Sequence, residues 1–129
     1  MRGYAREVAF CKVYTYIMSG AFDDDFEQFD VEKLGDDAEF AGTLAKGVID
    51  EKADLDSVIA NYSKSFKLSR IYRIDLAVLE LAVWEIRHTQ TPYQVVINEA
   101  VGIAKKYSTE KSVSYVNGIL AAFVRDNNA

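Results

Sequence analysis

The side chains that most often perform catalysis or bind metals are few in this sequence and poorly spaced for either role. His88 is the only histidine, and it follows Glu85 at the Glu-x-x-His spacing of one half of a di-iron site in a helical bundle. Such a site needs a second Glu-x-x-His motif, which the sequence lacks. We therefore interpret His88 as a surface residue near the C-terminal end of a helix, where a cation complements the helix dipole.

A short acidic run has part of the spacing of a calcium-binding loop. Asp23, Asp25 and Glu27 alternate as its ligands would, but the sixth position would be Gln28 in place of glycine and the twelfth Leu34 in place of glutamate. Glycine-rich phosphate loops, zinc-spaced cysteines and partners for a nucleophilic triad are also absent from the sequence. These absences predict that the protein is not an enzyme and binds neither a metal nor a cofactor.

Side chains of the kind that bind single-stranded RNA are, in contrast, present. Such RNA is held by basic groups along its phosphates and by aromatic rings on which unstacked bases rest. The candidates are Arg2, Arg6, Lys67, Arg70, Lys105, Lys106 and Lys111, together with Tyr62, Tyr107 and Tyr115. Lysines with interleaved tyrosines also occur on many helical surfaces, and the pattern around Tyr107 places that ring in the core. Composition therefore permits RNA binding without requiring it.

Charge is distributed unevenly along the chain, whose formal net charge is −5. Residues 21–60 hold 13 acidic and three basic side chains, whereas residues 1–20 and 61–129 both carry a small positive excess. The two ends could therefore converge on a mildly basic face. The acidic stretch is either a solvated surface or a separate surface for a basic protein partner.

Length and cysteine content predict one independently folded domain, residues 1–129. A chain of 129 residues can bury a sizeable core without disulfides or structural metals. The single cysteine, Cys11, lies in an apolar helical pattern and cannot form an internal disulfide, which fits a reducing compartment. The sequence shows neither a signal peptide nor a membrane-spanning apolar stretch, so we expect a cytoplasmic protein.

Periodicity predicts an all-α fold with no convincing strand. The first helix is expected at about residues 4–18, with Ser19 and Gly20 as its stop. The spacing of Phe22, Phe26 and Phe29 predicts a short second helix that starts at the Asp23-Asp24-Asp25 run.

Five further helices follow from the same patterning. Two short amphipathic helices are expected around residues 40–48 and 55–62, the second capped by Asp54. The run from residue 70 to about 87 is apolar on nearly all sides, which is typical of a central helix. Thr91 followed by Pro92 predicts a capped helix start, and a last helix is expected over about residues 111–124.

Three phrases of the sequence resemble the NusB family of bacterial transcription antitermination factors. They are TPYQVVINEAVGIAKKYSTEKSVSYVNGIL at residues 91–120, AREVAFCKVYTY at 5–16 and DLAVLELAVWEI at 75–86. The resemblance covers about two-thirds of the chain, and the spacing of INEA, AKKYS and YVNG is its most specific part. It implies an all-α, NusB-like helical bundle of about seven helices in two packed sub-bundles.

The resemblance also implies a function and partners. NusB proteins bind the boxA element of nascent RNA together with NusE, a small-subunit ribosomal protein that doubles as an antitermination factor. The pair helps to assemble a complex with RNA polymerase that reads through terminators, notably in ribosomal RNA operons. We therefore expect boxA RNA and NusE as partners, and no membrane partner.

RNA-binding residues can be carried over where the phrases match. The family's arginine-rich N-terminus is represented by Arg2 and Arg6, with Gly3 and Tyr4 where further arginines are familiar. The remaining candidates are Tyr62, Lys105, Lys106, Lys111 and Tyr115, of which Tyr115 resembles a ring that stacks on a base. Lys111 stands where an acidic residue is familiar and should strengthen RNA contact, whereas Glu80 replaces a basic residue and should weaken it.

Residues that contact the protein partner can be carried over in the same way. Tyr14 and Asp75 match positions by which NusB engages NusE, and a carboxylate at the rim of an interface would steer a basic ribosomal protein. The alternative for Asp75 is a first-turn acid that stabilises its own helix. Asn98 and Asn117 are interpreted as buried or capping amides, and Gly118 as a site of close helix packing.

Two other functions remain compatible with the sequence. The chain could be a protein-only interaction module or homodimer with weakened RNA binding, consistent with its thin arginine run. It could also be the accessory RNA-binding domain of an RNA methyltransferase, because NusB-like domains precede RNA cytosine methyltransferase domains.

Overall fold

The computed structural model describes residues 2–23 and 25–127, and within these ranges every regular element is helical. Seven α-helical segments are present, of which the second is a single turn, together with two 3-10 turns. They are α1 (Gly3–Ser19), α2 (Val31–Leu34), η1 (Gly35–Asp37), α3 (Ala38–Asp50), α4 (Lys52–Tyr62), η2 (Leu68–Arg70), α5 (Arg73–His88), α6 (Tyr93–Tyr107) and α7 (Glu110–Asn127). None of the helices in these ranges is long and apolar enough to cross a membrane.

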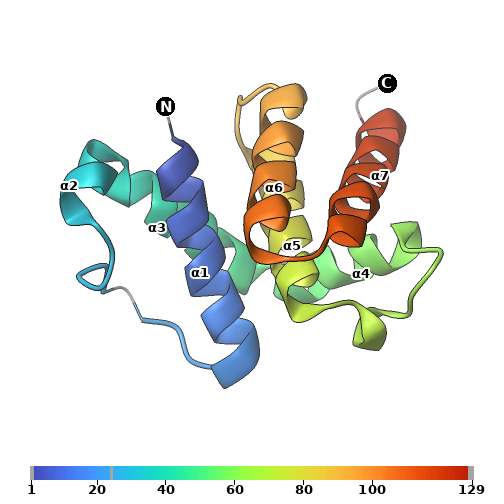
Figure 1. Cartoon of the computed structure of the whole chain (residues 1–129), viewed down its shortest axis with the longest axis horizontal. Coiled ribbons are helices and arrows are strands. Elements are labelled where there is room, and N and C mark those ends of the chain that lie inside the picture. The colour runs from blue at the N-terminus through green and yellow to red at the C-terminus, as the bar shows by residue number, and fades with distance from the viewer. Residues whose placement is uncertain (1, 24, 128–129) are drawn as a thin grey trace.

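The helices form two groups that meet at α5. Figure 1 shows α1, α2 and α3 on one side and α4, α6 and α7 on the other, with α5 behind and between them. Helix α5 packs against α1, α3, α4, α6 and α7, so it belongs to the core of both groups. The predicted all-α fold of two packed sub-bundles is therefore confirmed.

The central position of α5 follows from its composition. Eleven consecutive residues, 75–85, are buried, as expected for a helix that is apolar on nearly all sides. The helix begins at Arg73, three residues later than predicted, because residues 68–70 form the separate turn η2 and the backbone is extended at Ile71. This arrangement leaves a connector, residues 63–72, between α4 and α5.

The prediction of a helix over Phe22–Phe29 is wrong. Side-chain oxygens of Asp23 and Asp25 accept hydrogen bonds from the backbone N–H groups of Asp25 and Glu27, which satisfies these donors without a helix. The buried ammonium of Lys12 binds the carbonyl oxygens of Asp23 and Asp25 and so holds the segment against α1. Asp24, part of the predicted helix start, lies outside the described residues.

Two predicted helix caps are also wrong. Helix α4 begins at Lys52, so Asp54 lies in its first turn and Glu51 occupies the capping position. Helix α6 begins at Tyr93 with Pro92 preceding it, and the Thr91 hydroxyl accepts a hydrogen bond from the Thr89 hydroxyl instead of capping. In both places the helix start is displaced along the chain from the residue whose side chain could cap it.

The carboxyl group of Glu80 is fully buried and faces α4. The Lys52 ammonium donates hydrogen bonds of 2.8 Å to Glu80 and to Asp56. Burial raises the pKa of Glu80 to about 9, although the nearby Lys52 ammonium acts in the opposite direction. Because the side chain has no exposed surface, Glu80 cannot itself contact RNA.

Candidate nucleic-acid interface

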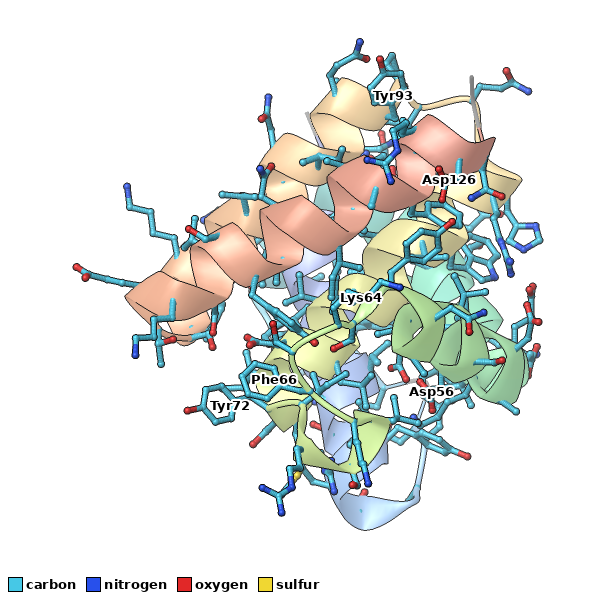
Figure 2. The ribbon with its side chains drawn as sticks, turned by 90° about the vertical axis from the view of Figure 1, so that its right-hand side faces the viewer. Asp56, Lys64, Phe66, Tyr72, Tyr93 and Asp126 are labelled. Atoms are coloured by element: carbon cyan, nitrogen blue, oxygen red, sulfur yellow. The ribbon has the colours of Figure 1, made fainter. Side chains whose placement is uncertain are left out.

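A hollow of about 420 Å³ lies between the connector and the start of α7; we call it the first hollow. Its walls include three aromatic rings, its rim includes two cations, and a buried carboxylate lies in its lining. These residues are Phe66, Tyr72, Tyr115, Arg70, Lys111 and Asp75. Figure 2 shows Phe66 and Tyr72 side by side near the start of α7.

The ring of Tyr115 is held in place from two sides. Its hydroxyl group lies 2.6 Å from the Ser63 hydroxyl, and its ring packs edge-on against Phe66 with centroids 5.5 Å apart. Burial raises the pKa of Tyr115, so the group stays a neutral phenol at pH 7. A fixed, uncharged ring at the wall of a hollow is suited to stacking against a flat ligand.

Two exposed cations, Arg70 and Lys111, line the first hollow, and three more are exposed on the stretch between α4 and the start of α5: Lys64, Lys67 and Arg73. No carboxylate in residues 2–23 or 25–127 lies within ion-pair distance of any of them, although Glu110 also reaches the rim. Unpaired cations beside aromatic walls are what a single-stranded nucleic acid requires.

A second hollow of about 410 Å³ adjoins the first one. Its lining is mainly apolar and comes from the end of α1, the start of α5 and the end of α6; it includes Tyr14, Met18, Tyr72, Arg73 and Tyr107. Tyr14 and Tyr107 both pack on the buried ring of Phe10, with centroids 6.2 and 5.1 Å away. Tyr107 is 36% exposed, so its predicted place in the core is wrong.

The structure brings together only part of the predicted RNA-binding set. Lys111 and Tyr115 line the first hollow. Lys105 and Lys106 are exposed on the last turn of α6, where Lys106 forms a 2.9 Å ion pair with Glu7. The Tyr62 hydroxyl donates to Asp126 at 2.9 Å, and this bond raises the pKa of Tyr62.

The two N-terminal arginines have different environments from each other. Arg2 directly precedes α1 and is exposed, 4.1 Å above the Phe40 ring and 3.5 Å from Asp37, and it is not in the lining of the first hollow. Arg6 is only 6% exposed and binds Glu85 through two donors, at 2.8 and 2.6 Å. Its guanidinium is therefore occupied inside the protein and is not placed to contact a phosphate.

Asp75 is likewise buried, with 3% of its surface exposed. Its two carboxylate oxygens accept hydrogen bonds of 2.8 Å from Ser108 and Ser112. Asp75 thus links the start of α5 to the junction of α6 and α7. This geometry opposes the expectation of a rim carboxylate that contacts a protein partner.

Three residues of the INEA and YVNG phrases are placed differently from their interpretation. Asn98, Asn117 and Gly118 are all exposed, and a Cβ added at Gly118 would meet no atom within 4 Å. They neither bury an amide nor allow close helix packing. His88, in contrast, is the last residue of α5 as predicted, and its ring lies 3.0 Å from Glu51.

Sequence reasoning missed Phe66 and Tyr72 as site residues. The signal available was the run KSFKLSRIYR at residues 64–73, which alternates cations with aromatic and apolar side chains between two helices. This run forms a site only together with the start of α7, which lines the other side of the first hollow and lies more than 35 positions away along the chain. In the part of the chain that the structure describes, no group of three or more potential metal ligands occurs.

Comparison with known proteins gives one consistent family. The sequence model of the NusB family matches residues 4–125. Transcription antitermination protein NusB of Acetivibrio thermocellus is 44% identical over 100 residues, covering 77% of this chain and 68% of that relative. The NusB protein of Finegoldia magna is 37% identical over 130 residues, covering 96% of this chain and 93% of its own.

Solved structures of NusB proteins superpose on this chain and so indicate the same family as the sequence relatives. T. maritima NusB superposes with a TM-score of 0.84 at 31% identity, covering 98% of this chain and 92% of that one. A crystal structure of antitermination factors NusB and NusE in complex with dsRNA superposes with a TM-score of 0.82 at 26% identity, covering 97% and 96%.

Proposed function

Because the chain belongs to the NusB family, we propose that it is a transcription antitermination factor that binds boxA-type RNA together with the ribosomal protein NusE. The bound pair joins the antitermination complex with RNA polymerase and promotes read-through, notably of ribosomal RNA operons. The protein acts by binding and not as an enzyme, and it works in the cytoplasm, where bacterial transcription takes place.

The first hollow supports the RNA part of this proposal most directly. Three aromatic rings and two cations, Arg70 and Lys111, line it, and three more exposed cations lie on the adjoining stretch between α4 and the start of α5. None of these five cations has an ion-pair partner in residues 2–23 and 25–127. Rings supply stacking surfaces that tolerate any base, and the cations neutralise the phosphates between the bases. We place Tyr115 and Lys111 at its centre, with Lys67 and Arg70 along the connector.

The other carried-over residues take outlying places in the proposed interface. Lys105 and Lys106 extend the cationic surface along α6, while Tyr62 and Arg2 lie beyond the first hollow. Arg6 and Asp75 act through the fold, since their charged groups are occupied by Glu85 and by two serines. One domain, residues 1–129, would thus contain both the RNA and the NusE surfaces.

The second hollow is our proposed NusE surface. Its exposed apolar side chains, Met18, Tyr72 and Tyr107 among them, resemble the core of a protein interface more than a phosphate track. Tyr14, the residue carried over for NusE contact, lies in its lining. A protein of similar fold has been solved in complex with NusE and RNA together, which is consistent with adjacent surfaces for the two.

The change Tyr115→Ala is expected to weaken binding of a labelled boxA RNA by about 1–3 kcal/mol, roughly 5- to 150-fold, because it removes one stacking ring. Tyr115→Phe keeps the ring and loses only the bond to Ser63, so it should bind RNA almost as the unchanged protein does. Fluorescence anisotropy measures both affinities.

The control for this experiment is Tyr93→Ala. Tyr93 is also an exposed tyrosine, but it is the first residue of α6 and lies far from Phe66 and Tyr72 (Figure 2). Its removal should leave RNA affinity unchanged. If Tyr115→Ala folds and binds RNA as tightly as Tyr93→Ala does, the first hollow is not the RNA site.

A further inference from the structure

The two hollows meet at a shared wall, and the proposed function does not say whether this wall connects binding in one hollow to binding in the other. Only Tyr72 and Thr109 line both of them within the described ranges. A residue that touches two sites at once can make binding at one depend on binding at the other. A residue of the shared wall can therefore connect binding in one hollow to binding in the other.

The two wall residues differ in how firmly they are held. The Thr109 hydroxyl lies 3.0 Å from the Ser112 hydroxyl and accepts the Ser112 backbone N–H, so its position is fixed by α7. The Tyr72 side chain is 62% exposed, and no hydrogen bond or ring partner holds it in residues 2–23 and 25–127. Of the two, Tyr72 is the one that a ligand can reorient.

The backbone of Tyr72, in contrast, is well anchored. Ile71 beside it is buried, and the Tyr72 carbonyl oxygen accepts the first hydrogen bond of α5 from Leu76 at 2.9 Å. A side chain without a hydrogen bond or ring partner on an anchored backbone can change rotamer without moving either helix. The other two rings in the lining of the first hollow, Phe66 and Tyr115, differ from Tyr72 because they pack on each other.

We propose that Tyr72 couples the two sites, so that a ligand in one hollow orders the ring and thereby tightens binding of the other ligand in the adjacent hollow. This inference rests on the proposed function, with RNA in the first hollow and NusE in the second. The ligand that binds first bears the entropic cost of immobilising the ring, and the second binds a ring already ordered. Fixing one side chain of this kind changes affinity by about 2- to 12-fold.

The test is a coupling factor, defined as the dissociation constant of a labelled boxA RNA without NusE divided by that with saturating NusE. Tyr72→Ala should lower this factor by about 2- to 12-fold relative to the unchanged protein. Tyr72→Phe retains the ring and should retain the factor, as should Tyr93→Ala. Because the factor is a ratio, a contact that Tyr72 makes with only one ligand does not alter it.

Reciprocity supplies an internal check, since RNA must change NusE affinity by the same factor. If the unchanged protein shows coupling and folded Tyr72→Ala shows the same coupling, the inference is overturned while the proposed function stands. If the unchanged protein binds no RNA, or binds it equally with and without NusE, the proposed function itself fails and the inference fails with it.

Discussion

Replacing Arg6 with alanine is expected to lower the free energy of unfolding by about 3–5 kcal/mol. The Arg6 guanidinium binds both oxygens of Glu85, which is itself 1% exposed, and lies 3.5 Å from Glu99. Removing it leaves the Glu85 charge buried without a partner. Urea denaturation followed by circular dichroism measures this loss, and RNA affinity of the folded fraction should fall little.

Two further variants separate this explanation from a direct RNA contact. Arg2→Ala removes an exposed arginine from the same end of α1 and should cost far less stability. The double change Arg6→Met with Glu85→Leu removes both buried charges and should restore most of the stability. Unchanged stability of Arg6→Ala combined with a large loss of RNA affinity would return Arg6 to the RNA surface and contradict our placement of it.

The change Asp75→Lys is expected to cost about 3 kcal/mol or more of folding stability. It removes two hydrogen bonds to a charged acceptor, each worth about 1.5–3 kcal/mol, and places an unpaired cation at a site that is 3% exposed. Thermal or urea denaturation measures the effect. Loss of NusE binding would then follow from loss of the folded state.

Asp75→Asn is the matched control for this change. An asparagine keeps one acceptor oxygen for a serine hydroxyl and offers an amide donor to the other, so it should cost about 1 kcal/mol. NusE affinity should be near that of the unchanged protein. A stable Asp75→Lys protein that fails only to bind NusE would show instead that Asp75 contacts the partner directly.

The spacing of apolar residues was sufficient to predict a helix where the sequence of that helix alone determines its burial. The all-round apolar run of α5 predicted a central helix, and its eleven buried residues agree. The phenylalanines between residues 22 and 29 have helical spacing as well, yet they pack on α1 and α3 from an irregular segment. There, backbone N–H groups donate to the carboxylates of Asp23 and Asp25, and the Lys12 ammonium donates to two backbone carbonyl oxygens, so these backbone groups are satisfied without a helix.

Burial of charged groups could not be predicted, because it depends on partners far away in the chain. Arg6 and Glu85 are 79 positions apart, and Asp75 and Ser112 are 37 apart. A sequence shows each of these residues as a charge on an amphipathic helix. Only the packed bundle shows that the charge faces inward, and the family resemblance that assigned Arg6 and Asp75 to binding surfaces does not contain this information.

The candidate site was predictable in composition but not in shape. Tyr115 and Lys111 were found through the resemblance of one phrase to a family, whereas Phe66 and Tyr72 had no family phrase to identify them. Their importance comes from the connector that folds against the start of α7. The outward position of Asn98 and Asn117 was missed for a similar reason, since helical spacing does not say which face meets solvent.

The most direct test of the account is fluorescence anisotropy of a labelled boxA RNA titrated with this protein, alone and with equimolar NusE, at two salt concentrations. We predict binding that tightens with NusE and weakens with salt, with a logarithmic slope of about −2 to −3.5 for three to five phosphate contacts by the cations around the first hollow. Absence of RNA binding by the folded protein, both with and without NusE, would contradict it.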